Sequence, residues 1–547
     1  MPGGIAVTAI DSPTDPRRPG VTGVVVGALL LLAGFELWAI LTLNHGALLY
    51  ALDDAYIHLG LAARLHGGHY GINAGEASSP SSSILWPFLL APFSGWSRFE
   101  WVPLILNLLA ALGTAVVIPR LSMLVLGPAA SRPGALFHAV LGVLLLVLFN
   151  TVALVFLGLE HSLQVLLTLL AVLQLFEVAG GGRPRAWLWP VLVLGPLVRY
   201  ENLVLTLPAL GFLWFMGHRR AALVTLASLA GLLATFSLFL IGQGLPPLPS
   251  SVLMKMGAKA NPVWVLDRLV QNLLQTWSGP WLLLLGLALL GRVLARGERG
   301  PRGLALVILL AILGHSLFGR FGAFHRYEIY VLAAAVTAAA LVHRERIRGW
   351  FRAGPRLAGA IALAVLALAS GRSLYGLVVT PFATHELYCQ QYLMGRFARE
   401  VLRAPVAVND LGLVAFRNPH FVVDLWGLGS PEVLEARKEL RAMAWADTLC
   451  RRHGAVVAMI YDSWLPDRPA SWKRVGVLRL AASPDGPASG ALAKLLRFAH
   501  RRSGSTVVVG ADSVSFYVVP PADENRVRES LERFRPRLVE GAELTLE

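Results

Sequence analysis

Long apolar runs separated by short arginine clusters dominate this sequence. The first run, residues 21–43, is long enough to cross the hydrocarbon core of a bilayer, and similar runs recur as far as residue 379. The 547 residues are 55% hydrophobic and 15% charged, with a mean hydropathy of +0.61, which excludes an ordinary soluble globular protein. The sequence therefore predicts a polytopic α-helical membrane protein.

The basic clusters predict how the chain is oriented in the bilayer. Arg17 and Arg18 place residues 1–20 in the cytoplasm as a tail, and every later cluster falls on the same side when the apolar runs are counted as about eleven spans. The formal net charge of +15 follows from this distribution, so nucleic acid is not an expected partner. Residues 44–100 then form the first outer loop.

Two segments do not fit simple spans. Residues 84–93 are too short to cross and predict an interfacial or re-entrant helix. Residues 187–216 carry Arg199-Tyr200-Glu201-Asn202 in their middle, which predicts two short helices joined by a polar, outward-facing turn.

The composition changes after residue 380, where the predicted membrane part (residues 21–380) ends. Residues 381–547 are typical of an extracytoplasmic α/β domain, with strand-like runs at 406–408, 421–423, 455–460, 506–509 and 516–519 and helical segments at 391–402 and 431–450. The chain has two cysteines, Cys389 and Cys450, for which a disulfide and two free thiols are both open.

Polar residues gather in the predicted outer connections. Because charged groups near hydrocarbon are costly, we expect them to share one pocket that handles an anion and a proton. A lone Arg or Lys at a helix end can instead be a snorkelling anchor, and a lone His a structural donor. The outer set is Asp53, Asp54, His58, His69, Glu160, His161, Arg199, Glu201, Lys255, Lys259, Arg320, His325 and Arg326.

Several blocks carry a family resemblance. Asp53-Asp54-Ala55-Tyr56-Ile57, with Gly71-Ile72-Asn73-Ala74-Gly75-Glu76 downstream, resembles the first outer loop of bacterial GT-C class glycosyltransferases in the branch near the mycobacterial arabinofuranosyltransferases. Later blocks that resemble this class are Gly158-Leu159-Glu160-His161, Arg199-Tyr200-Glu201-Asn202, the proline-rich run that ends at Lys255, Asn409-Asp410-Leu411-Gly412 and Asp424-Leu425-Trp426-Gly427. Arg199-Tyr200-Glu201 departs from the family's Arg-Pro-Glu at its middle residue.

The resemblance implies transfer of a sugar from a polyprenyl-phosphate donor to an envelope glycan, lipid or protein at the outer face of a bacterial cytoplasmic membrane. In this interpretation Asp54 is the general base, with Asp53 as its orienting or metal-linked neighbour and Glu160 as a further catalytic carboxylate. The phosphate would be bound by Lys255, Arg199, Arg326 and Arg320. Substrate contacts are expected from His58, Tyr56, His69, Glu201 and, in the outer domain, Trp426.

We expect no required metal, although Asp53, Asp54 and Glu160 offer oxygen ligands suited to Mg²⁺ or Mn²⁺. Two other classes stay open. A lipid or glycan transporter or flippase would also have many spans, but such proteins usually show internal repeats, and none is visible here. A non-catalytic envelope scaffold would not need the Asp pair, Glu160 and Lys255 on one face.

Overall fold

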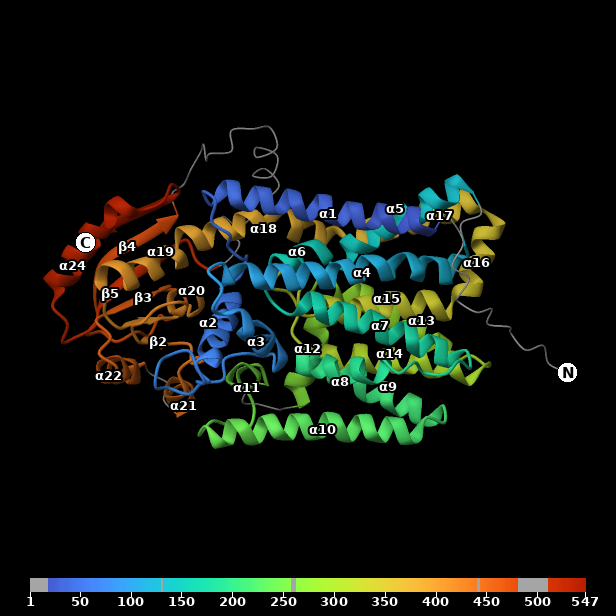
Figure 1. The fold of residues 1–547 in the computed structure, drawn as a ribbon, viewed down its shortest axis with the longest axis horizontal. Coiled ribbons are helices and arrows are strands. Elements are labelled where there is room, and N and C mark those ends of the chain that lie inside the picture. The colour runs from blue at the N-terminus through green and yellow to red at the C-terminus, as the bar shows by residue number, and fades with distance from the viewer. Residues whose placement is uncertain (1–17, 129–130, 257–261, 440–442, 481–509) are drawn as a thin grey trace.

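The computed structural model describes residues 18–128, 131–256, 262–439, 443–480 and 510–547. It has two parts, a long helix bundle and a smaller sheet domain packed against one end of it (Figure 1). The predicted combination of apolar helices with a C-terminal α/β domain is therefore confirmed.

Helices long and apolar enough to cross a membrane make up most of the bundle. Among the described residues there are five: α1 (Arg18–Leu43), α4 (Val102–Leu126), α7 (His161–Ala179), α10 (Arg219–Gly242) and α14 (Arg299–Phe318). Two more candidates are bent pairs: α12 (Pro262–Leu274) with α13 (Gly279–Leu294), bent by 101°, and α17 (Pro355–Ala369) with α18 (Gly371–Cys389), bent by 46°.

Shorter apolar helices complete the bundle: α5 (Arg132–Leu148), α8 (Leu188–Val198) and α15 (Ile329–Val342). By length and composition the structure has five to seven spans in its described part, so the predicted number of about eleven is not confirmed. The difference arises because several apolar runs fold as helices of 10–17 residues or as bent pairs, which are shorter than the usual length of a single span.

The two unusual segments form the short helices that were predicted, while their positions relative to a membrane stay predictions. Residues 187–216 form α8 and α9 (Leu203–Phe215), separated by the turn η3 (Tyr200–Asn202). Residues 84–93 form α3 (Leu85–Leu90) and η1 (Ala91–Phe93), and the Ile84 N–H donates to the Leu197 carbonyl at 3.1 Å. The segment therefore packs at the end of α8.

The remaining bundle elements are α2 (Asp54–His66), η2 (Phe99–Trp101), α6 (Thr151–Val155), α11 (Ser250–Met256) and α16 (Arg344–Ala353).

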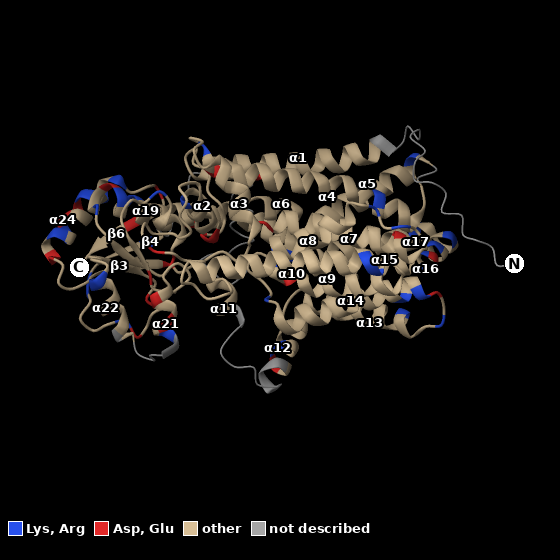
Figure 2. Cartoon of the chain, turned by 60° about the horizontal axis from the view of Figure 1, so that its bottom comes forward, with Lys and Arg blue, Asp and Glu red and all other residues tan. Residues whose placement is uncertain are grey.

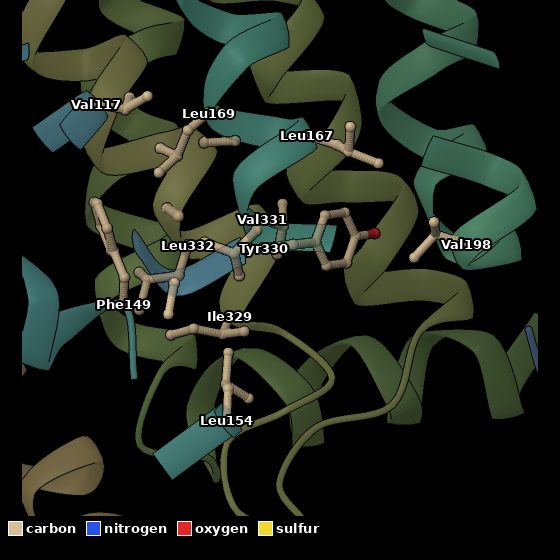
Figure 3. Packing of buried hydrophobic residues seen from close by; sticks show 14 of the residues in the cluster. Val117, Phe149, Leu154, Leu167, Leu169, Val198, Ile329, Tyr330, Val331 and Leu332 are labelled. Carbon is tan, nitrogen blue, oxygen red and sulfur yellow. The ribbon is translucent and has the colours of Figure 1, made fainter. Parts of the chain in front are cut away.

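The start of α15 lies in the centre of the core. Its residues Ile329, Tyr330, Val331 and Leu332 are almost fully buried and pack among side chains of α4, α6, α7 and α8 (Figure 3). The Tyr330 hydroxyl donates to the Glu201 carbonyl at 2.9 Å, which satisfies the polar tip of a buried ring. This contact ties the core to the η3 turn.

The sheet has six strands in the order β2-β1-β3-β5-β4-β6. β1 (Val406–Val408) pairs in parallel with β2 (Val422–Asp424) and β3 (Val457–Ile460), so that Val406 lies beside Val422 and Val457. The other half is antiparallel: β4 (Lys473–Leu480), β5 (Ser513–Val518) and β6 (Ala542–Leu546). The strands predicted at 406–408, 421–423, 455–460 and 516–519 are correct, β4 and β6 were missed, and the run at 506–509 lies outside the described residues.

Helices surround the sheet: α19 (Gln391–Arg396), the π-helical turn η4 (Phe397–Leu402), α20 (Gly412–Ala415), α21 (Pro431–Glu439), α22 (Ala444–Arg452), α24 (Glu524–Phe534) and η5 (Arg535–Arg537). The predicted boundary after residue 380 falls inside α18, which therefore runs from the bundle into the sheet domain. Cys389 and Cys450 are free thiols, both buried.

The first outer loop covers one edge of the sheet. The Asn73 side chain donates to the Val422 carbonyl at 3.0 Å and accepts from the Val422 N–H at 2.9 Å. β2 is the edge strand of the sheet, so no further strand pairs with it on this side. The Asn73 side chain instead forms the hydrogen bonds that a neighbouring strand would form with the backbone of Val422. The loop and the sheet domain are thus joined by hydrogen bonds.

Basic residues gather at the other end of the bundle. Helix α16 and the beginning of α1 lie at the end away from the sheet domain (Figure 1). Lys and Arg are grouped around α16 and its neighbouring connections, and others lie on the sheet domain at α19, α22 and α24 (Figure 2). The cluster at α16 is of the kind that the positive-inside rule expects on the cytoplasmic side.

Candidate active site

A partly exposed carboxylate and a buried guanidinium form the centre of the candidate site. Asp54 begins α2, and its Oδ2 accepts from Nη2 of Arg326 at 2.6 Å. The Asp54 side chain is 45% exposed and that of Arg326 only 7%. Nη2 of Arg326 also donates to the Tyr327 hydroxyl at 2.7 Å, and its guanidinium lies 4.7 Å from the centre of the Tyr327 ring.

Arg326 keeps part of its hydrogen-bonding capacity unused. Its buried Nε and Nη1 atoms have no hydrogen-bond partner among the described residues. A buried donor without a partner is costly, typically about 1–3 kcal/mol and more for a charged group. Such donors next to an exposed carboxylate are suited to an incoming anion.

A constrained loop presents Arg326. Four consecutive residues, Gly322, Ala323, Phe324 and His325, have φ between +46° and +91°, a region that L side chains seldom adopt. Glu328 and Asn150 hold this loop, since the Gly322 N–H donates to Glu328 Oε2 at 3.0 Å and Asn150 Nδ2 donates to the Phe324 carbonyl at 2.8 Å. Backbone strain of this kind persists only where neighbours fix it, and it concentrates at functional sites.

A second arginine organises the carboxylates behind this centre. Arg199 binds Glu201 through two parallel hydrogen bonds, Nε to Oε2 at 3.2 Å and Nη2 to Oε1 at 2.6 Å. Its Nη1 donates to Glu160 Oε1 at 2.9 Å and to the Ser82 hydroxyl at 3.1 Å. The Glu160 side chain is completely buried, so Arg199 supplies its charge partner.

The turn before Glu160 needs a glycine. Gly158 has φ +69°, and a Cβ at this position would lie 2.6 Å from the Tyr50 ring. The Gly158 carbonyl accepts from the indole N–H of Trp86 at 3.3 Å. The turn is therefore fixed against the first outer loop, which places Glu160 at the beginning of α7.

His58 of α2 lies close to Glu160. It lies one helical turn after Asp54, on the same face of α2. The Ser81 hydroxyl donates to the Ser83 carbonyl at 2.6 Å, so His58 Nδ1, 3.1 Å from that hydroxyl, is assigned as the protonated nitrogen. Burial lowers the pKa of His58, which keeps the ring neutral. Its Nε2 is then an acceptor, 3.7 Å from Glu160 Oε2.

Asp53 lies next to these residues, but its side chain binds the sheet domain. Its Oδ1 accepts from the Leu413 N–H at 2.8 Å and its Oδ2 from the Gly412 N–H, so it fastens the first outer loop to the beginning of α20 in the sheet domain. A Cβ at residue 412 would lie 2.1 Å from the Asp53 carbonyl, which explains the glycine. With both oxygens engaged by backbone donors, Asp53 is a docking residue in this structure.

A second carboxylate faces Asp53 from the carboxyl ends of the parallel strands. Asp410 follows β1 and accepts from Gln391 Nε2 at 2.8 Å. Burial, the largest cause, and the nearby charge of Asp54 raise the pKa of Asp410 to about 6. Burial and the charge of Asp410 likewise raise the pKa of Asp53. The junction of the two parts is therefore acidic, and burial favours the neutral form of both carboxyl groups.

The other candidate residues take separate places. Tyr56 accepts from the Tyr50 N–H at 3.2 Å inside the core. His69 contacts two carbonyls of its own loop, those of Asn73 and Glu76. Trp426 lies in the sheet domain, 4.3 Å below the Arg437 guanidinium and 5.6 Å from the Trp464 ring. Arg320 is exposed in the loop that carries Arg326.

Lys255 lies in α11, and its side chain, like the whole of Lys259, is outside the described residues. The α11 segment itself borders the site, because the Ser250 N–H donates to the Ser79 carbonyl at 2.9 Å. The same serine-rich loop supplies Ser81 to His58 and Ser82 to Arg199.

The carboxylates do not form a metal site in the described residues. No group of three or more His, Cys, Asp or Glu side chains is arranged there to hold an ion. Asp53 binds backbone N–H groups, Asp54 binds Arg326, and Glu160 binds Arg199. Each of the three carboxylates proposed as oxygen ligands therefore has a different protein partner.

Sequence reasoning missed several members of the site. Tyr327, Ser81 and Ser82 contact the candidate residues directly, and Asp410 with Gln391 faces Asp53. Tyr327 could have been found as the aromatic neighbour of Arg326 in an outer connection. The serines could not, because a run of five serines within residues 78–83 is equally typical of an ordinary loop.

Comparisons with known proteins find a family model that matches part of the chain and solved structures that resemble it. Residues 385–510 match the model of a family described as "Domain of unknown function (DUF8728)". The chain is similar in structure to the oligosaccharyltransferase of Archaeoglobus fulgidus in its apo form, with a TM-score of 0.45 and 10% sequence identity, over 84% of this chain and 73% of that one. No curated protein matches the sequence.

Proposed function

We propose that this protein is a membrane glycosyltransferase that takes a sugar from a polyprenyl-phosphate donor and passes it to an envelope acceptor at the outer membrane surface. The observation that carries the proposal is the pair of Asp54 and Arg326. A partly exposed carboxylate lies 2.6 Å from a buried guanidinium that has two further donors without partners in the described structure. Proton removal and anion binding are thus combined at one point.

The chemistry assigned to this pair is a displacement at the anomeric carbon. The acceptor hydroxyl forms the new C–O bond, the bond from the anomeric carbon to the phosphate oxygen breaks, and Asp54 takes the hydroxyl proton. General-base help of this type contributes typically ~10²–10⁴ in rate. Arg326, with Lys255 as the second cation, stabilises the negative charge that develops on the departing polyprenyl phosphate.

Arg326 has a second role in this proposal. Its Nη2 atom is hydrogen-bonded to Oδ2 of Asp54, so this carboxylate oxygen is occupied. A donor phosphate at Nε and Nη1 shares the charge of the same guanidinium and weakens its attraction for Asp54. Binding of the donor therefore activates the base.

The residues behind the pair position it. Arg199 donates hydrogen bonds to Glu160, Glu201 and Ser82, so we assign it the role of positioning these residues. Arg326 ranks ahead of it as the phosphate ligand. His58 lies on the face of α2 that carries Asp54, and Glu160, at the beginning of α7, lies 3.7 Å from it. In this assignment no step passes through a metal ion.

The sheet domain is proposed to hold the acceptor. Trp426, only partly buried, and Trp464, 40% exposed, form an aromatic pair beside Arg437, and such surfaces suit sugar rings through stacking and hydrogen bonds. Asp424 shapes the loop, because its two oxygens accept from the Trp426 and Gly429 N–H groups. This role requires that the sheet domain lies outside the membrane and that α16 lies in the cytoplasm. The transferred sugar can be a pentose or a hexose in this proposal.

The experiment is a transfer assay with the purified full-length protein. A panel of radiolabelled polyprenyl-phosphate sugars is incubated with the protein and membrane extract, and the movement of label into acceptor material is followed. Arg326→Gln should lose transfer and weaken donor binding. Arg320 is exposed and, unlike in the prediction from sequence, is not assigned to the phosphate in this proposal, so Arg320→Gln, which removes the same charge from the same loop, should keep both.

Absence of transfer from every donor in the panel, with folded protein and intact donor binding, would refute the reaction. Equal activity of Arg326→Gln and Arg320→Gln would refute the assigned phosphate site while leaving the reaction standing.

A further inference from the structure

An apolar cavity lies at the end of the bundle opposite the candidate site. It has a volume of about 860 Å³ and is enclosed by α4, α5, α15, α16 and α17. Ligand pockets usually span roughly 300–1,000 Å³, so this cavity is large enough for a substantial apolar group. Its lining includes Leu121, Phe137, Ala340, Phe351, Ala358 and Ile361.

The cavity opens toward the surface that a bilayer would cover. Lining residues of α17 are also among the exposed apolar side chains, with Leu357 at 68% and Ile361 at 55% exposure. Trp350 of α16 lines the cavity and is 67% exposed at its rim. An open apolar cavity in the membrane part of a protein is accessible to lipid tails.

Cationic groups surround the same rim. Helix α16 has the sequence Arg-Glu-Arg-Ile-Arg-Gly-Trp-Phe-Arg-Ala, in which Ile347, Trp350 and Phe351 line the cavity. Arg348 is engaged with the end of α4, where it donates to the Leu124 and Val125 carbonyls, each at 2.9 Å.

Two further arginines next to the lining are exposed. Arg352 follows Phe351, and Arg356 precedes Leu357. An amphipathic helix with basic residues beside an apolar cavity is complementary to an anionic phospholipid, whose acyl chain is apolar and whose headgroup is negative.

We infer that this cavity binds an anionic phospholipid from the adjacent leaflet, with one acyl chain between α5, α15 and α17 and the headgroup at Arg352 and Arg356. The site is distinct from the candidate active site and does not depend on the proposed reaction. Its lipid would brace α17, which buries only Gly359 and Ala369 against the rest of the protein.

The test is lipid retention by the full-length protein in detergent micelles, followed by native mass spectrometry. Phosphatidylglycerol and phosphatidylcholine with identical acyl chains are the probes. Wild type should retain phosphatidylglycerol in preference to phosphatidylcholine. Ala358→Trp, which fills the cavity, should lose the bound lipid, and Ala362→Phe serves as a second filling variant should the first not fold.

The headgroup is tested with charge variants. The double variant Arg352→Gln/Arg356→Gln should lower phosphatidylglycerol affinity roughly tenfold or more, because each basic contact with anionic lipid contributes appreciably. The matched control is Arg219→Gln/Arg220→Gln, which removes two exposed charges at the beginning of α10, away from the cavity.

Three results would overturn the inference. The first is equal retention of the two lipids by wild type. The second is retention by folded cavity-filling variants that matches wild type. The third is an effect of the control pair as large as that of the Arg352 and Arg356 pair.

Discussion

The buried ion pair of Arg199 and Glu160 allows a quantitative prediction. Glu160 has no exposed side-chain surface, Arg199 has 4%, and the two are joined at 2.9 Å. Removing one partner of a buried pair leaves the other as an uncompensated charge, which costs about 3–5 kcal/mol. Arg199→Ala should therefore lower the free energy of unfolding by about this amount, at the upper end because Glu201 also loses the two hydrogen bonds that Arg199 donates to it.

The double variant Arg199→Ala/Glu160→Gln separates pairing from general damage. Once Glu160 is neutral, no buried charge remains at that position, so the double variant should be more stable than the sum of the single effects predicts. We expect a coupling energy of about 2 kcal/mol, within the range of about 0.5–3 kcal/mol for residues in one network.

The assay is a reversible denaturant titration in detergent micelles with all four members of the cycle. A matched control is the pair of Arg185 and Glu177, separated by 3.5 Å with side chains 46% and 27% exposed. Exposed pairs contribute about 1 kcal/mol or less, so the control cycle should show little coupling. Strict additivity at Arg199 and Glu160, or coupling no larger than in the control, would refute the framework role of Arg199.

Three further predictions concern the acidic junction, the second cation and the topology. The pKa of Asp410 in the folded state, about 6, is above its ordinary value, so its contribution to stability is fully present below the ordinary pKa and is lost as pH rises through about 6. Unfolding temperatures measured from pH 4 to 8 should therefore fall in wild type and change less in Asp410→Asn. Identical slopes in the two proteins would contradict this prediction. Lys255→Ala should weaken donor binding and slow transfer together, and unchanged donor affinity would remove Lys255 from the site. Cysteine-accessibility mapping should find residues 344–356 inside and Asp54 outside, and the reverse labelling would contradict the proposed orientation.

The sequence was a reliable guide to elements whose pattern is local. β1 and β2, the break between α8 and α9, and the short α3 follow from apolar runs, turn residues and length. The span count was less predictable, because an apolar run of 14–17 residues such as α5 or α15 has the same composition whether it crosses a bilayer or fills the interior of a bundle.

The proximity of some candidate residues was predictable, but their pairings were not. Asp54, Glu160, Arg199 and Arg326 come from separate connections and lie near one another in the structure, while their roles stay predictions. Asp53 shows the limit of this reasoning. Its role at Gly412 depends on a contact across 359 residues, and nothing local to the Asp pair separates a docking carboxylate from a proton acceptor.

The exchange of Asp54 for asparagine tests the central claim most directly. Asn keeps the size and hydrogen-bonding ability of the side chain but cannot take a proton. With the donor identified from the radiolabelled panel, we predict that Asp54→Asn binds the donor with nearly wild-type affinity and that its turnover falls by about 10²–10⁴. Turnover within a few-fold of wild type, at equal donor occupancy, would contradict the assignment of Asp54 as the base.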